Sequence, residues 1–245
     1  MSAAATGATA LRVLTQLRRD PRTMVLLLFV PALLMILLRF VFDGRQETFD
    51  SLGGPMIGLF PFITMFLVTS ITMLRERTGG TLERLMSMPV GKLDLLSGYG
   101  VAFAAVAAVQ AGVTAGVAFL LLGLDVGGSA GAVVLLAIGN AVLGMALGLF
   151  VSAFATSEFQ AVQFMPAFVL PQLLLCGLFV ARDQMAGWLE GISDALPLTY
   201  AFDALDRVAS GADFGGRGVL DVAVIVAATL LALGLGALTL RRRTA

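Results

Sequence analysis

Charged residues that could bind a partner are concentrated in one stretch of this sequence, "RERTGGTLERLMSMPVGKLDLLSG", residues 75–98. This stretch holds seven of the chain's 32 charged residues. It predicts a short helix with Thr81 as N-cap, Glu83 and Arg84 on a polar side, and Pro89 as its end. A carboxylate and a guanidinium on one helix side offer charge-assisted hydrogen bonds to another protein. We therefore predict a contact element for a protein partner. The alternative is an ordinary solvated loop.

Most enzyme and metal chemistry is excluded by the residue types. The chain has no histidine, which rules out an HExxH site, a histidine-based triad and a histidine proton relay. Cys176 is the only cysteine, so an intrachain disulfide or a thiolate metal cluster cannot form. Gly91-Lys92 is followed by leucine and lacks the upstream glycine of a phosphate-binding loop. We predict no catalytic residue and no metal ligand, and any nucleotide energy must come from a partner.

The composition is that of a membrane protein. Hydrophobic residues make up 58% of the chain and charged residues only 13%, against roughly 25% charged residues in soluble domains. About 20 apolar residues span the hydrocarbon core as a helix, because lipid offers the backbone no hydrogen-bonding partner. We predict an all-α polytopic membrane protein with six transmembrane helices. The predicted spans are 23–42, 55–74, 99–122, 130–154, 161–180 and 219–240.

The charge distribution predicts the orientation. With both termini cytoplasmic, that side holds eleven of the 16 basic and five of the 16 acidic residues, a balance of +6 inside and −6 outside. This obeys the positive-inside rule. Residues 1–22 predict an amphipathic helix in the inner headgroup layer, ended by Pro21, with an unstructured basic leader as the alternative. Residues 23–240 form the permease domain and 241–245 a cytoplasmic tail. The first span is expected to stay uncleaved, because no small-residue cleavage pattern follows it.

The stretch 180–218 is too long for a simple connector. Apolar residues at helical spacing predict two short amphipathic helices there, an outer hairpin, with Trp188 and Tyr200 at the membrane interface and Pro197 between them. Whether such a hairpin is a static lid or a valve stays open at this point.

Polar and small residues inside the spans predict how the helices pack. We expect Gln110 and Asn140 to hydrogen-bond to each other, and Arg39 to pair with Asp43 one turn on. Small residues four positions apart permit close helix packing. Two glycine pairs have this spacing: Gly112 with Gly116, and Gly144 with Gly148.

Two motifs of this chain, and the order in which they occur, resemble those of the type-2 ABC exporter permeases. Arg75-Glu76-Arg77, followed by "GGTLE" at 79–83 and by Pro89, is similar to the family signature "RERxxGTLExLxxxP". The outer stretch 177–211, with its tryptophan and "LPLTYAFDALDR", is similar to the family's "NPLTYxxDALR" segment. The chain departs from that segment at Leu196, where asparagine is common, and at Asp206, which precedes Arg207. In size and pattern it looks closest to daunorubicin-resistance and nodulation-factor exporter subunits.

The resemblance implies a permease that works with ATP-binding subunits. Such permeases pair with a second copy or a sister permease, carried on two cytoplasmic subunits that bind ATP and Mg²⁺, while the permease itself binds no cofactor. Residues 79–88 would then be a coupling helix seated in the ATP-binding subunit, and the turn with Glu158 a second contact or a plain connector. The residues implied in coupling are Glu76, Gly80, Leu82, Glu83, Arg84, Pro89 and Glu158.

In this family the substrate path runs between the two copies, lined mainly by the second and fifth spans. Aromatic side chains suit an apolar or amphipathic cargo such as a drug, an antibiotic or a lipid-like molecule, and sparse hydroxyls and amides can bind its polar part. Each candidate residue on these two spans could instead face lipid or a neighbouring helix. The candidates are Phe60, Thr64, Phe66, Ser70, Phe168 and Gln172.

Two other function classes stay open. One is a secondary transporter or channel that works without ATP, for which inverted repeats and buried ionisable residues are typical. The sequence shows no convincing repeat, and we expect no acid or base deep in any span. The other is an intramembrane enzyme, which the absent histidine and the lack of a carboxylate pair within a span disfavour. The expected location is the bacterial plasma membrane, with multiple crossings and no nucleic-acid partner.

Overall fold

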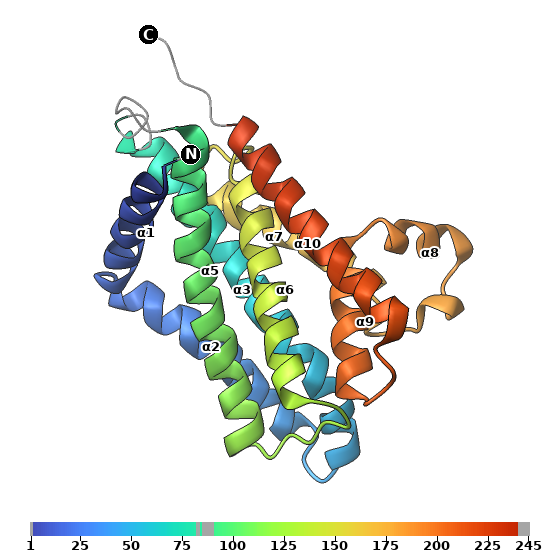
Figure 1. Ribbon diagram of the computed structural model, residues 1–245. Coiled ribbons are helices and arrows are strands. Elements are labelled where there is room, and N and C mark those ends of the chain that lie inside the picture. Colours follow the sequence, from blue (N-terminus) through green and yellow to red (C-terminus); the bar gives the residue numbers. More distant parts are fainter. Residues whose placement is uncertain (1, 82–83, 85–90, 240–245) are drawn as a thin grey trace.

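The computed structural model describes residues 2–81, 84 and 91–239, and these residues form helices joined by loops, without a strand (Figure 1). The predicted all-α fold of a polytopic membrane protein is therefore confirmed. The helices are α1 (Ala3–Arg18), α2 (Pro21–Val41), α3 (Gln46–Thr78), α5 (Lys92–Gly116), η1 (Val117–Leu121), α6 (Ala130–Val151), α7 (Glu158–Leu175), η2 (Arg182–Gln184), α8 (Gly187–Asp194), α9 (Pro197–Ala209) and α10 (Gly215–Leu238).

Local sequence signals begin and end several helices. Asp20 caps α2 by accepting a hydrogen bond from the Thr23 amide at 3.2 Å, and Pro21 occupies the first turn. Hydrogen bonds from Thr23, the side-chain bond first, lower the pKa of Asp20. The break at Pro21 between the N-terminal helix and the first span is thus confirmed. Serine side chains cap three other helices in the same way: Ser2 for α1, Ser129 for α6 and Ser157 for α7.

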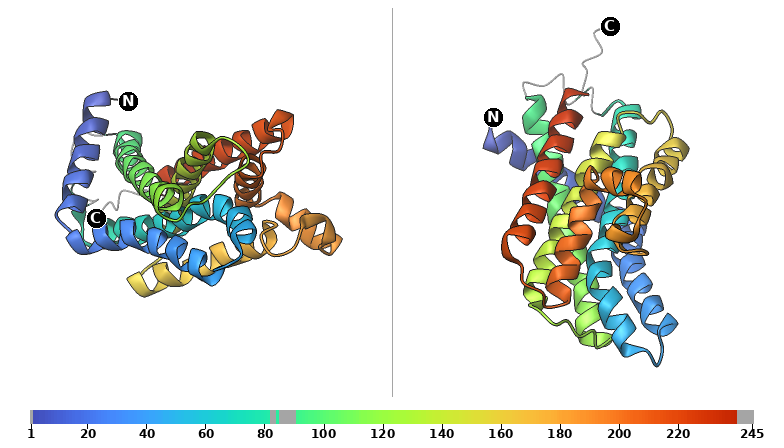
Figure 2. Two further views of the ribbon diagram at one scale, coloured as in Figure 1. Left: turned by 90° about the horizontal axis from the view of Figure 1, so that it is seen from below. Right: turned by 90° about the vertical axis from the view of Figure 1, so that its right-hand side faces the viewer.

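The apolar side of α1 packs within the chain. Ala10, Val13 and Leu17 are buried, in one cluster with Tyr99 and Phe103 of α5. Figure 2 shows α1 along one flank of the bundle and α8 on the other. The predicted amphipathic helix is confirmed, but its apolar stripe covers protein rather than lipid. The reason is that α5 offers a complementary apolar surface, which sequence spacing cannot reveal.

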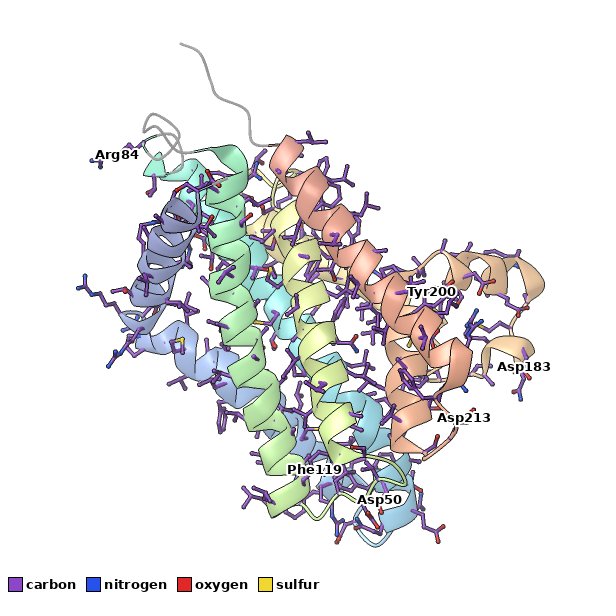
Figure 3. All side chains as sticks on the ribbon, in the orientation of Figure 1. Asp50, Arg84, Phe119, Asp183, Tyr200 and Asp213 are labelled. Atoms are coloured by element: carbon purple, nitrogen blue, oxygen red, sulfur yellow. The ribbon has the colours of Figure 1, made fainter. Side chains whose placement is uncertain are left out.

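Several loops gather at two opposite ends of the molecule, whereas the α1–α2 turn and the loops around α8 lie on its flanks (Figure 1). At the terminal end, defined by residues 2, 79–81, 156–158 and 239, the Ser2 amide donates to Asp94 at 2.9 Å and Arg77 to Thr239 at 3.3 Å. At the far end, defined by residues 43–46, 123–129 and 210–214, the Gly127 amide donates to the Ala209 carbonyl at 2.8 Å. Arg84 lies at the terminal end, and Asp50 and Asp213 lie toward the far end (Figure 3). The loops that define each of these ends were predicted to share a side, whereas α8 and its loops, also predicted on the outer side, lie on a flank.

Five helices in the described part of the chain are long and apolar enough to cross a membrane: α2, α3, α5 continued by η1, α6 and α10. The predicted span 161–180 is not among them. Its helix, α7, has 18 residues, includes three glutamines, and ends at Leu175 before Gly177, whose φ of +102° favours glycine. Between Glu158 at the terminal end and Ala209 at the far end, the chain passes through α7, α8 and α9. The boundaries predicted for the fifth span are wrong, and the count of six stays a prediction.

Close packing of α3 on α6 forms the centre of the bundle. A Cβ atom at Gly144 or Gly148 would collide with the carbonyl oxygens of Phe62 and Phe66. Thr69 of α3 also donates to the Met145 carbonyl of α6 at 3.2 Å. The small-residue prediction is confirmed on α6. On α5, Gly112 and Gly116 have no such neighbour within 4 Å among the described residues, so close packing there stays a prediction.

The predicted amide pair inside the bundle is wrong. Gln110 donates to the Leu27 carbonyl at 2.7 Å and to the Thr64 hydroxyl, whereas Asn140 donates to the Ala201 carbonyl at 3.4 Å. Both amides bond to backbone that a neighbouring helix presents at their depth. The pairing of Arg39 with Asp43 is confirmed at 3.8 Å.

Candidate functional site at the end of α3 and the α8–α9 hairpin

Three consecutive charged residues at the end of α3 reach three different parts of the chain. Arg75 pairs with Glu158 of α7, Glu76 with Arg12 of α1, and Arg77 with Thr239 after α10. These partners lie 83, 64 and 162 positions away in the sequence. Consecutive residues on a helix point about 100° apart, so one triplet can reach three neighbours. This end of α3 is therefore a junction of the helices around it.

The Arg75–Glu158 contact has two parallel hydrogen bonds. The Nε–Oε1 distance is 2.8 Å and the Nη2–Oε2 distance is 2.9 Å. Hydrogen bonding by Arg75 lowers the pKa of Glu158. Both side chains are more than half exposed, at 57% and 53%, so the pair contributes only about 0–1 kcal/mol. Glu158, predicted as a second contact with a partner, lies at the surface but is engaged by Arg75.

Glu76 lies inside the chain. Its side chain is only 4% exposed, and Oε1 lies 3.3 Å from Nη1 of Arg12. Arg12 also donates to the Tyr99 hydroxyl and lies 5.4 Å from the centre of that ring. The prediction that Glu76 contacts a separate protein is corrected: burial by α1 and α5 leaves Arg12 as its partner. Together with the Ser2–Asp94 bond, this contact attaches α1 to both helices that flank the segment 82–90.

The predicted coupling helix lies mostly outside the described residues. Gly80 has a φ of +71°, which suits the predicted turn after α3. Residues 81 and 84 are helical, the Arg84 amide donates to the Gly80 carbonyl at 3.1 Å, and the Arg84 side chain is exposed. Leu82, Glu83 and Pro89 belong to the undescribed part, so the roles assigned to them stay predictions.

The structure separates the residues predicted to line a substrate path. Phe66 and Ser70 are buried, and Gln172 is also buried, donating to the Phe168 carbonyl at 3.0 Å. Thr64 donates to a carbonyl of its own helix and accepts from Gln110. Within this single chain, Phe66 and Ser70 do not face an open surface, and their place in a path between two copies stays a prediction.

Phe60 and Phe168 remain accessible. Phe60 lines an apolar groove of about 440 Å³ between α2, α3 and the end of α7, together with Met56, Ile63, Leu173 and Leu178. Phe168 is exposed on α7. Of the six candidates, these two lie where an apolar molecule could reach them.

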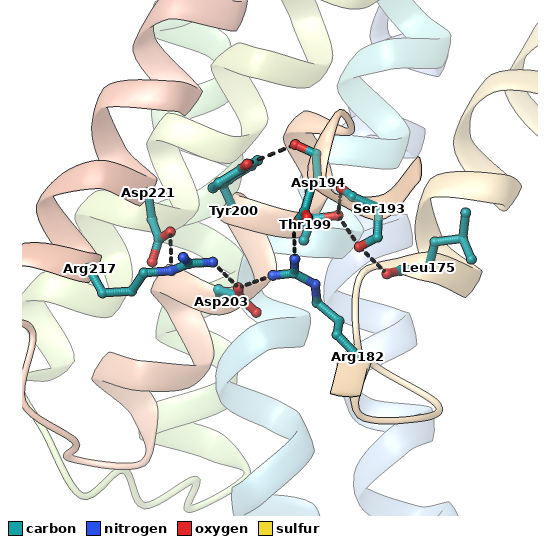
Figure 4. Close-up of polar contacts among 9 residues, drawn as sticks. All are labelled: Leu175, Arg182, Ser193, Asp194, Thr199, Tyr200, Asp203, Arg217 and Asp221. Carbon is teal, nitrogen blue, oxygen red and sulfur yellow. Dashed lines mark hydrogen bonds and ion pairs between the residues drawn. The ribbon is translucent and has the colours of Figure 1, made fainter. Parts of the chain in front are cut away.

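The predicted outer hairpin is present as α8 and α9. Pro197 occupies the first turn of α9, and the Tyr200 hydroxyl donates to the Asp194 carbonyl at 2.7 Å. Thr199 donates to the Ser193 carbonyl and Ser193 to the Leu175 carbonyl, both at 2.8 Å (Figure 4). Trp188 is exposed on α8, as an interfacial tryptophan would be.

The two hairpin helices differ in burial. Most of α9 is buried, whereas Ser193 is the buried residue of α8. At its end, α9 meets Gly127 and Gly128, where the backbones approach too closely for a Cβ atom. α9 is therefore part of the core, and α8 is attached at its C-terminal end.

Sequence reasoning missed a ladder of alternating charges beside this hairpin (Figure 4). Arg182 contacts Asp194 and lies 3.0 Å from Asp203 Oδ2. Arg217 lies 3.7 Å from the same oxygen and 3.5 Å from Asp221. Asp221 is 0% exposed although it lies near the start of α10, so it is buried by protein. The i, i+4 spacing of Arg217 and Asp221 was the available signal, but only the fold brings Asp203 between the two arginines.

A family model described as "ABC-2 type transporter" matches residues 5–208 of this chain. The chain belongs to the ABC-2 type transporter family. The match begins in α1 and ends in α9, so it includes the end of α3 and the Phe60 groove, while Arg217, Asp221 and Thr239 follow it.

Curated proteins support the ABC-2 assignment. The chain is 25% identical to "ABC transporter G family member 20" of Dictyostelium discoideum over 163 residues, which is 66% of this chain and 22% of the relative. It is 25% identical to "Probable multidrug ABC transporter permease YbhR" of Escherichia coli K12 over 156 residues, 62% of this chain and 42% of the relative. It is 26% identical to "Linearmycin resistance permease protein LnrN" of Bacillus subtilis over 182 residues, 74% of this chain and 47% of the relative. The matched part of this chain covers less than half the length of each of these relatives.

ABC-2 permeases are membrane components of ABC transporters and are not themselves the ATPase. Family membership thus implies an ATP-binding partner.

Proposed function

We propose that this chain is the permease subunit of an ATP-driven exporter. In this proposal two ATP-binding subunits in the cytoplasm bind ATP and Mg²⁺, and the permease pairs with a second copy or a sister permease. Both termini face the cytoplasm of a bacterial cell, in agreement with the +6 inside and −6 outside charge balance.

The observation that carries this proposal is the junction at the end of α3. The segment 79–88 directly follows residues that are tied to α7, α1 and the end of α10. A partner that pushes this segment would therefore displace three neighbouring elements and not α3 alone. Switching proteins transmit small shifts in this way, because packed elements move as rigid bodies.

An apolar or amphipathic cargo is the best-supported substrate class. The groove beside Phe60 is lined by aliphatic and aromatic side chains from three helices, and such walls bind apolar groups. Two relatives carry the words "multidrug" and "linearmycin resistance" in their names, which fits a cargo of that class.

The test is assembly and transport with Glu83→Lys. The chain is purified from its native membrane, and the ATP-binding subunit that co-purifies with it is identified. Glu83→Lys should leave expression unchanged, weaken co-purification of that subunit and abolish transport. Thr15→Lys is the control, because it also introduces a lysine on the same predicted side, at an exposed position of α1. Normal assembly and transport by Glu83→Lys would remove the role assigned to Glu83. Transport without any ATP-binding subunit would favour the secondary transporter or channel instead.

A further inference from the structure

Asp221 is a buried carboxylate that lacks hydrogen bonds. It is 0% exposed, and neither carboxylate oxygen has a hydrogen-bond partner within the part of the chain that the structure describes. Its nearest cation is Arg217 at 3.5 Å. An ionised carboxylate in such a place loses its hydration without replacement, and a buried group of this kind becomes neutral instead.

The ladder around Asp221 has one negative charge too many. It contains the carboxylates of Asp194, Asp203 and Asp221 but only two guanidinium groups, those of Arg182 and Arg217. The charges that act on Asp221 come from Arg217 on its own helix, Asp203 and Arg207 on α9, and Arg182 in η2.

Further neighbours do not supply the missing positive charge. Asp206 and Arg207 line the same polar pocket, and counting both leaves four carboxylates against three guanidinium groups. α6, which also packs on α10, contains no charged residue. One proton on a carboxylate would balance the cluster, and Asp221 is the one without hydrogen bonds.

We propose that Asp221 is a proton-binding site that balances the ion-pair ladder holding α8 and α9 against α10. With the proton bound, Asp221 is neutral and attracts Arg217 only weakly, so Arg217 stays paired with Asp203. When the O–H bond of Asp221 breaks and the proton passes to water at the far end, the new carboxylate attracts Arg217 away from Asp203. Asp203 then draws Arg182 from Asp194, the residue at the end of α8. The attachment of α8 thus depends on the pH at the far end.

Infrared spectroscopy tests the site directly, without a transport assay. The full chain is measured in lipid nanodiscs for the carbonyl stretch of a protonated carboxylic acid at neutral pH. The band should be present in the wild type, absent in Asp221→Asn and retained in the control Asp183→Asn, whose acid is exposed in η2. A wild type without the band, a band that persists in Asp221→Asn, or a band removed by Asp206→Asn would each overturn the proposal.

Asp206 is the acid that must be distinguished from Asp221. Burial and the nearby Asp203 raise the pKa of Asp206, which is why Asp206→Asn is part of the test. If Asp221→Asn does not fold, Arg217→Gln gives a second readout. Removing the nearby cation disfavours the carboxylate, so the band should persist to a pH about one unit higher. A band that disappears at an unchanged or lower pH in Arg217→Gln would contradict the assignment of the proton to Asp221.

Trp188 reports the consequence for α8, because it is the only tryptophan in the chain. Quenching of its fluorescence by an aqueous quencher should increase over the pH range in which the infrared band disappears. The chain has no histidine, so no histidine titration between about pH 5 and 8 can produce this transition. Asp221→Asn should show no transition, whereas the same transition in Asp221→Asn would overturn the link between Asp221 and the hairpin.

Discussion

Two regions of this molecule hold arginines against carboxylates, and they do so in opposite ways. At the end of α3, Arg75 and Glu76 make separate contacts with different helices, and the Arg75–Glu158 pair is more than half exposed. Beside α9, two arginines share Asp203 in one continuous ladder that ends at a fully buried acid. The exposed Arg75–Glu158 contact can break at little cost, independently of the buried Glu76–Arg12 contact. A shared contact couples its members, so the loss of one affects all of them.

This difference suits two different tasks. The α3 junction connects several helices without locking them, which fits a part that must transmit displacement. The ladder holds the hairpin in one arrangement until its charge changes. The following substitutions would break or sharpen this contrast, from the largest expected effect to the smallest.

Asp203→Ala should have the largest effect. It removes the carboxylate shared by Arg182, whose side chain is 16% exposed, and Arg217. Removing one partner of a hydrogen-bonded charge pair costs about 2 kcal/mol or more, and we expect about 2 kcal/mol because Arg217 is half exposed. Thermal unfolding of the purified chain measures this loss of stability. Asp183→Ala is the control, and its stability should lie within about 0.5 kcal/mol of the wild type. Equal stability of the two variants would show that the ladder is not cooperative.

Glu76→Gln should have an intermediate effect. The change keeps the size of the side chain but removes the charge that faces Arg12, and a hydrogen bond to a charged group contributes about 1.5 kcal/mol. The coupling is measured by unfolding Glu76→Gln, Arg12→Gln and the double variant. We expect a coupling free energy of at least about 0.5 kcal/mol. Strict additivity would mean that α1 is not held by this pair.

Breaking the Arg75–Glu158 pair should have the smallest effect on stability, about 0–1 kcal/mol. Because hydrogen bonding lowers the pKa of Glu158 below its ordinary 4.5, the contribution is present above that pH. It is lost as the pH falls through the lowered value. The unfolding difference between the wild type and Glu158→Gln should therefore vanish in acid.

Exchanging these two charges separates a contact within the chain from a contact with a partner. If the pair acts within the chain, Arg75→Glu combined with Glu158→Arg should restore the stability and transport that either single change reduces. Rescue of stability without rescue of transport would instead indicate that one of these residues contacts the ATP-binding subunit.

Much of the fold could be predicted because its signals are local. Apolar stretches of about 20 residues predicted α2, α3, α5, α6 and α10, since the transfer of apolar side chains into lipid depends on composition. The break at Pro21 and the two hairpin helices were likewise visible in short segments. α7 was misjudged, because its glutamines, its prolines and Gly177 end the helix early while the surrounding apolar residues suggest a longer span.

The candidate site was predicted only in part. The motif at 75–77 identified the correct segment, but it could not show that Glu76 is buried beneath α1. The ladder was not found, because Arg182, Asp203 and Asp221 are far apart in the sequence and each looks like an ordinary surface charge.

The sequence by itself determined that this protein is a helical membrane protein of the ABC-2 permease type, because hydropathy, capping residues and the "RER" motif are each contained within a short segment of the chain. Only the tertiary structure decided which charges meet. The partners of Arg75, Glu76 and Arg77 lie 64 to 162 positions away. The environment of Asp221 is set by α9 and η2. Burial and ion pairing depend on the neighbours that packing brings together, and those neighbours are not encoded in any short segment of the chain.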